Sequence, residues 1–68
     1  MDDSRIKVQG TPHEVMITAN GAGLRELAER LIGLADADVH DGYHEHLEVD
    51  LGLVAGSTSL ILERNENV

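Results

Sequence analysis

The spacing of hydrophobic residues changes twice along the chain, and this change constrains the fold more than any other feature. Residues 5–9 and 14–19 alternate polar and apolar side chains with a period of two, which is typical of strands with one face in water. Between them, Gly10 and Pro12 favour a turn, so the sequence predicts a hairpin. From Asn20 onward the apolar residues instead recur three and four positions apart, as on one side of a helix.

The predicted helix spans residues 22–34, with Asn20 as its N-cap and an ion pair between Glu26 and Arg30 at the favourable spacing of four. Its first turn contains Asn20-Gly21-Ala22-Gly23, but a phosphate-binding loop needs a longer glycine pattern followed by Lys and Ser or Thr. We therefore interpret these glycines as the joint between a strand and a helix.

Strand-like alternation returns over residues 43–51 and 59–64. The acidic segment 35–42 and the glycine-bounded segment 52–57 lack this pattern and are interpreted as connections. The order β-β-α-β-β predicts an α+β domain in which a four-stranded, largely antiparallel sheet has the helix on one face and an open second face. Strand order stays undecided, because either edge pairing satisfies short, uncrossed connections.

The expected core is aliphatic, since the chain contains one tyrosine and no other aromatic residue. Alternation places Tyr43 and Leu51 on the same face of the third strand as Leu47 and Val49. The side chains expected to be buried are Leu24, Leu27, Ala28 and Leu31 of the helix and Ile6, Val8, Ile17, Leu47, Val49, Leu60 and Leu62 of the strands.

Length and charge restrict the class of protein. A chain of 68 residues builds a single domain, and residues 1–4 and 65–68 are expected to fray at its ends. There is no cysteine, no signal-peptide pattern and no apolar run long enough to span a membrane, so we expect a cytoplasmic protein. Thirteen acidic and five basic residues give a net charge of -8, which disfavours nucleic acid and anionic membranes as partners and favours a basic protein.

A row of polar residues is predicted on the open face of the third strand. Alternation places His44, His46, Glu48 and Asp50 on one side of that strand. Zinc accepts such ligands, but same-face positions are about 6.5 to 7 Å apart, so a metal site needs a further ligand such as His40 or His13. The alternative is a polar face that meets water or a partner, and we favour it.

Catalysis is not expected. Imidazoles and carboxylates transfer protons, but a flat strand face gives little shelter from water, and no Ser or Cys nucleophile lies in an evident motif. No catalytic residue and no cofactor are therefore assigned.

The same open face is the expected contact surface for another protein or for a second copy of the chain. Alternation places the apolar Met16 and Ile61 beside the polar row, and aspartates of the preceding loop lie at its margin. The predicted partner-binding residues are His44, His46, Glu48, Asp50, Met16, Ile61, Asp36, Asp38 and Asp41.

Several short motifs are arranged in the same order as in a known family. They are Ile17-Thr18-Ala19-Asn20, Gly23-Leu24-Arg25-Glu26-Leu27-Ala28 with Leu31, His44-x-His46-Leu47, and Gly56-Ser57-x-x-Leu60-Ile61-Leu62-Glu63-Arg64. Together they resemble the bacterial Immunity protein 32 family over nearly the whole chain. The resemblance implies a small cytosolic protein of a polymorphic toxin system that neutralises a cognate toxin domain by binding it, without catalysis. It names neither the toxin nor any catalytic residue.

Overall fold

The computed structural model describes residues 3–68, so the fraying expected for residues 1–4 lies partly outside the described residues. In the described part the elements follow the order β1 (Ile6–Gly10), β2 (Val15–Ala19), α1 (Gly21–Ala35), β3 (His44–Val49), β4 (Gly52–Leu53) and β5 (Leu60–Glu63). The predicted α+β class is confirmed. The strands, however, form two sheets, β1-β2 and β4-β3-β5, in place of one sheet of four, and β4 is a short additional strand. No helix in residues 3–68 has the length and hydropathy needed to cross a membrane.

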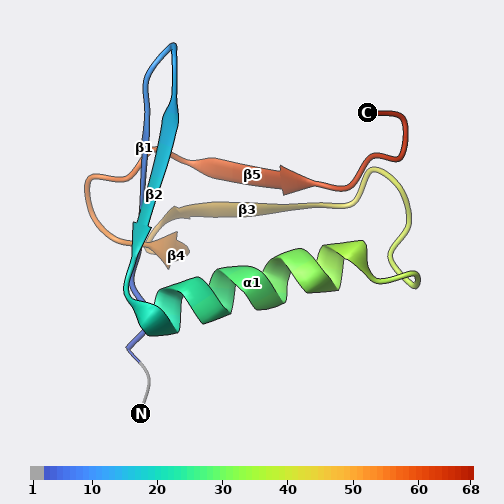
Figure 1. Ribbon diagram of the computed structural model, residues 1–68, viewed down its shortest axis with the longest axis horizontal. Coiled ribbons are helices and arrows are strands. Elements are labelled where there is room, and N and C mark those ends of the chain that lie inside the picture. Colours follow the sequence, from blue (N-terminus) through green and yellow to red (C-terminus); the bar gives the residue numbers. More distant parts are fainter. Residues whose placement is uncertain (1–2) are drawn as a thin grey trace.

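The first sheet is the predicted hairpin. β1 and β2 pair antiparallel, from Ile6 opposite Ala19 to Gly10 opposite Val15. Thr11 shapes the turn, because its hydroxyl oxygen accepts hydrogen bonds from the backbone N–H groups of His13 (3.2 Å) and Glu14 (3.1 Å). The hairpin projects well beyond the second sheet, at a steep angle to β3 and β5 (Figure 1).

The second sheet is built around β3. β5 pairs with β3 antiparallel, with Leu60 opposite Leu47 and Ile61 opposite His46. After Val49 the chain reverses sharply through Asp50, whose φ of 70° is in the left-handed region, and Gly52, whose φ is 105°. Beyond this tight turn, β4 lies alongside the end of β3. The two pair in parallel, with Gly52 opposite Glu48 and Leu53 opposite Val49. The turn also ends the strand alternation that the sequence extends to residue 51.

Helix α1 begins at a well-defined cap that also holds the start of the chain. As predicted, Asn20 is the N-cap: its Oδ1 atom accepts from the backbone N–H of Gly23 (2.8 Å) and also from that of Arg5 (3.1 Å). Its side-chain amide donates to the carbonyl oxygen of Asp3 (2.7 Å). Gly23 is buried, and a Cβ atom there would overlap the carbonyl oxygen of Arg5. A glycine is therefore required where the helix packs against the entry to β1.

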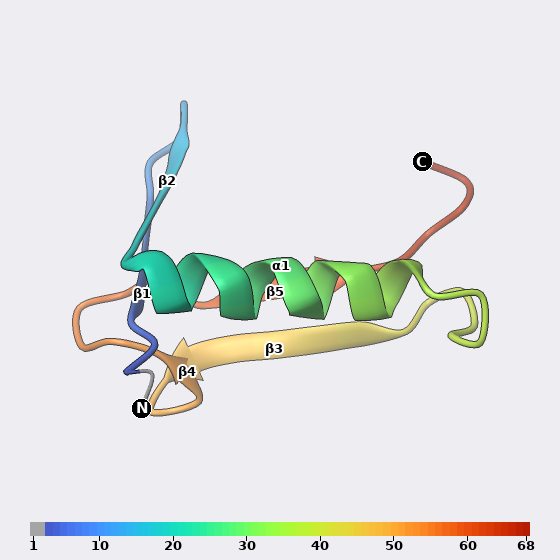
Figure 2. The same ribbon diagram turned by 60° about the horizontal axis from the view of Figure 1, so that its bottom comes forward.

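The core lies where the hairpin, the helix and β3 meet, and it is small. Its buried members are Ile6, Val8, Leu27, Leu47 and Leu53, and Ala19, Leu60 and Leu62 pack against them partly buried. Burial is thus confirmed for Ile6, Val8, Leu27 and Leu47. Figure 2 shows the helix lying along the sheet over β3 and β5, with the hairpin standing beyond this layer.

The predicted burial is wrong for several apolar residues, because only a narrow line along the helix is covered and the hairpin projects beyond the second sheet (Figure 1). Val49 and Leu51 border the turn at Asp50, where the chain leaves the sheet. Tyr43 precedes the first residue of β3. The residues wrongly expected to be buried are Leu24, Ala28 and Leu31 of α1, Ile17 of β2 and Val49 of β3; Tyr43 and Leu51, which alternation places on the same face as Val49, are exposed as well. Leu34 and Leu53, which were not among the predicted core residues, are buried.

Candidate partner-binding surface

The face of β3 that points away from the helix is polar, as predicted. Glu45 points toward α1, since its carboxylate pairs with Arg30 (Nη1 to Oε1, 2.8 Å). Arg30 also pairs with Glu26 (Nε to Oε2, 3.1 Å), which confirms the predicted ion pair within the helix. Because successive side chains of a strand point to opposite faces, His44, His46 and Glu48 lie on the side opposite Glu45, and all three are exposed.

The two histidines of this face are neighbours. Their ring centroids are 5.0 Å apart and their planes meet at 67°. The Nδ1 atom of His44 lies 3.1 Å from the carbonyl oxygen of Gly42. A carbonyl oxygen only accepts, so this contact is a hydrogen bond in the tautomer that has the proton on Nδ1, which leaves Nε2 for a partner. Ile61, opposite His46 on β5, is 57% exposed and adds an apolar side chain to the same face.

Two of the predicted site residues lie elsewhere. Asp50 belongs to the tight turn after β3, so its side chain does not continue the row of alternating positions. Met16 belongs to the hairpin, a separate sheet, where it pairs with Gln9. The structure therefore brings together His44, His46, Glu48 and Ile61, and the row of four polar residues shortens to three.

The histidines do not assemble into a metal centre. Residues 3–68 contain no group of three His, Cys, Asp or Glu side chains placed to hold one metal ion. The ring of His40, considered as a further ligand, lies edge-on to Tyr43 with centroids 6.0 Å apart. His44, His46 and Glu48 are exposed, and their side chains carry hydrogen-bonding groups.

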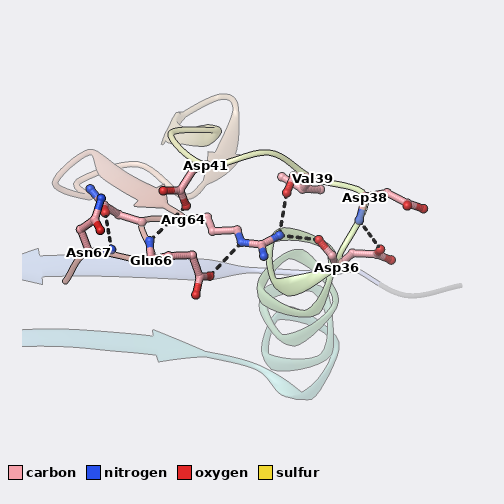
Figure 3. A network of polar contacts seen from close by, with 8 residues as sticks. Asp36, Asp38, Val39, Asp41, Arg64, Glu66 and Asn67 are labelled. Carbon is pink, nitrogen blue, oxygen red and sulfur yellow. Dashed lines mark hydrogen bonds and ion pairs between the residues drawn. The ribbon is translucent and has the colours of Figure 1, made fainter.

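The loop between α1 and β3 carries the predicted aspartates and is held in place by Arg64 (Figure 3). The guanidinium group of Arg64 donates to the carbonyl oxygens of Asp36 and Val39 and pairs with Glu66 (Nε to Oε2, 3.2 Å). Asp41 accepts from the backbone N–H of Glu66 (3.0 Å), which ties the loop to the C-terminal segment. The aspartates thus lie on an organised backbone at the His44 end of β3.

The sequence prediction missed the role of Arg64, although a signal was present. Arg64 is the only basic residue after Arg30. Unsatisfied carbonyl groups are expected where a helix ends, and a guanidinium group with five N–H donors can bind several of them. A lone arginine in an acidic segment is therefore a candidate for organising the backbone near a helix C-terminus.

Charge is divided unequally between the two halves of the molecule. Residues 5–35, which form the hairpin and the helix, contain four basic and three acidic residues, a net charge of +1. Residues 36–68, which form the loop and the three-stranded sheet, contain one basic and eight acidic residues, a net charge of -7. Nearly all of the acidic excess therefore belongs to the part of the chain that carries the polar face of β3 and its bordering loop.

Comparison with known proteins identifies a family. The family model described as Immunity protein 32 matches residues 14–65, a region that begins just before β2 and ends just after β5. Neither the curated proteins nor the solved structures gave a match.

Proposed function

The chain belongs to the Immunity protein 32 family, and we propose that it neutralises a cognate toxin domain by binding it directly. The observation that carries this proposal is the match over residues 14–65, which covers the helix and the three-stranded sheet. The chain would act in the cytoplasm of the bacterium that makes the toxin, as part of a polymorphic toxin system. No bond of the toxin would be made or broken.

The proposed contact surface is the outer face of β3 and β5 together with the loop beside it. His46 and Ile61 form its centre, with His44 and Glu48 on either side along β3. Asp36, Asp38 and Asp41 form the margin at the His44 end. Exposed imidazoles and a carboxylate offer hydrogen-bonding groups, and Ile61 offers an apolar anchor, a mixture that suits the centre of a protein interface.

The proposed toxin domain is basic. Residues 36–68 carry a net charge of -7, so their field attracts a cationic surface and speeds its encounter. Added salt should therefore slow association, whereas changes at the centre of the surface should mainly speed dissociation. A toxin that acts on nucleic acid has such a basic surface, and an acidic face placed over it would also block access of the substrate.

Titration of toxin activity tests binding without catalysis. The toxin domain encoded next to this chain would be purified and its activity measured after incubation with increasing amounts of the chain. Inhibition by binding predicts that activity falls in proportion to the added protein, reaches zero at a fixed molar ratio, and does not change with longer incubation. Complete loss at a ratio far below one chain per toxin, increasing with time, would show a catalytic mechanism. Undiminished activity in excess chain would refute neutralisation.

A further inference from the structure

Helix α1 leaves a large apolar surface uncovered. At about 100° per residue, the buried Gly23, Leu27 and Leu34 form one narrow line along the helix. The next arc, also about 100° wide, contains apolar residues only. We call this arc the uncovered helix face; its side chains are those of Leu24, Ala28, Leu31, Ile32 and Ala35, with Gly21 in the first turn, and all six residues are exposed.

The exposure of this face is substantial. Ile32 is 70% exposed, Leu24 53% and Leu31 48%. The face is continuous with a groove near the end of the helix, in which Leu31 and Ala35 lie beside Leu62 of β5. Single exposed apolar residues are normal on soluble proteins, but a contiguous row along about three turns of one helix indicates an interaction site.

The molecule exposes more surface than a compact domain of its size. Its accessible surface is 5101 Å², whereas a compact monomer of 7.4 kDa is expected to expose about 4,200 Å². Its radius of gyration is 12.7 Å, against about 11 Å for a compact domain of this length. The excess of about 900 Å² includes the projecting hairpin, whose residues 9–18 are all exposed, as well as the uncovered helix face. A standard protein interface buries roughly 800 Å² of each partner.

Charge indicates what covers this surface. Helix α1 contains two arginines and two glutamates, so it carries no net charge, and residues 36–68 hold the acidic excess. A basic partner is drawn toward the acidic part of the chain. Two copies, by contrast, can bring their neutral helices together while their acidic halves point apart. We infer that the uncovered helix face is the interface of a homodimer, covered by the same face of a second copy.

A two-fold axis gives this dimer a simple geometry. In a symmetric dimer the same surface meets itself, and a two-fold axis perpendicular to α1 at its middle makes the two helices antiparallel. Ala28 lies midway between Leu24 and Ile32, and its small side chain permits close approach of the two backbones at the axis. Leu24 of one copy then packs against Ile32 of the other. The polar face of β3 lies outside this contact, so the dimer presents two toxin-binding surfaces.

Light scattering coupled to size-exclusion chromatography tests the dimer. At about 100 μM the wild-type chain should have twice the monomer mass of 7.4 kDa. Ile32→Lys and Leu31→Glu each place a charge in the contact and should give the monomer mass. Lysine reduces the net negative charge and glutamate increases it, so a common result cannot arise from general repulsion. Both sites are exposed, and circular dichroism would show the fold retained.

Gln9→Glu, on the side of the hairpin opposite the core, is the control and should stay dimeric. A wild-type chain that is monomeric at this concentration would overturn the inference. Dimers that survive both substitutions would also overturn it, because the contact would then lie elsewhere. Ile32→Lys should still neutralise the toxin domain, which separates failure of the dimer from failure of the proposed function.

Discussion

Replacing Leu27 or Leu31 by alanine removes the same atoms from the same helix, four residues apart, and should give unequal results. Leu27 is 9% exposed and belongs to the core cluster with Ile6, Val8 and Leu47, whereas Leu31 is 48% exposed and lies on the uncovered helix face. The change in helix propensity and in side-chain volume is the same in both variants, so a difference in their stability reports the burial of the two leucines.

The expected magnitudes follow from the burial of each side chain. Leu27→Ala should reduce the free energy of unfolding by about 2 to 4 kcal/mol, since a buried leucine loses both its transfer free energy and its cavity contacts. The whole free energy of unfolding of a domain of this size is about 3 to 10 kcal/mol, so this variant is expected to be close to unfolding. Leu31→Ala should cost about 1 kcal/mol or less in the monomer, because the side chain already lies half in water.

The assay is urea denaturation followed by circular dichroism at about 1 μM chain, a concentration low enough to limit the contribution of the dimer. The urea midpoints of the two variants and the wild type give the loss of unfolding free energy for Leu27→Ala and for Leu31→Ala. Equal losses for Leu27→Ala and Leu31→Ala would refute the assignment of the helix faces. A neutral Leu27→Ala would show that the core does not lie where the hairpin, helix and β3 meet.

Three further substitutions test local contacts. Gly23→Ala should destabilise the fold despite a gain in helix propensity of about 1 kcal/mol, because the new Cβ overlaps the carbonyl oxygen of Arg5; a higher melting temperature would contradict this. Asn20→Ala should cost about 1 to 2 kcal/mol in urea denaturation, more than Asn20→Asp, which keeps the cap oxygen. Arg64→Ala should speed hydrogen exchange at the amides of Val39 and Glu66, and unchanged exchange there would exclude Arg64 as the residue that holds the loop.

The sequence predicted the elements well because their signals are local. The change of period at Asn20 marks the end of the hairpin and the start of the helix, and the cap chemistry of Asn20 is specific enough to place the first turn. The predicted helix over residues 22–34 differs from the observed Gly21–Ala35 by one residue at each end. The antiparallel pairing of β3 with β5 follows from their alternation and proximity in the chain.

Burial was harder to predict, since periodicity shows which side chains share a face but not how far a neighbouring layer extends. Leu24 and Leu27 both belong to the apolar side of α1, yet the sheet covers only Leu27. The alternation through Val49 and Leu51 concealed the turn at Asp50, although Asp and Gly two residues apart are a turn signal. That turn brings Leu53 into the core and removes Asp50 from the polar row.

The candidate site was predictable in part for the same reason. His44, His46 and Glu48 share a face because strand alternation is a local rule, and Ile61 joins them through the β3–β5 register. Met16 does not join them, because the division into two sheets depends on contacts between distant segments. The role of Arg64 likewise depends on the spatial meeting of the helix C-terminus with the last residues of the chain.

Calorimetric titration of the cognate toxin domain into the double variant His46→Ala, Glu48→Ala tests the central claim most directly. Both side chains are exposed and point away from α1, so the fold should be unchanged by circular dichroism. The account predicts a dissociation constant at least about tenfold weaker than that of the wild type, which corresponds to about 1.4 kcal/mol. The control Arg25→Ala, Glu29→Ala, on the outer polar side of the helix, should bind as the wild type does. A change of about twofold or less for the His46 and Glu48 variant, with the fold intact, would contradict the account.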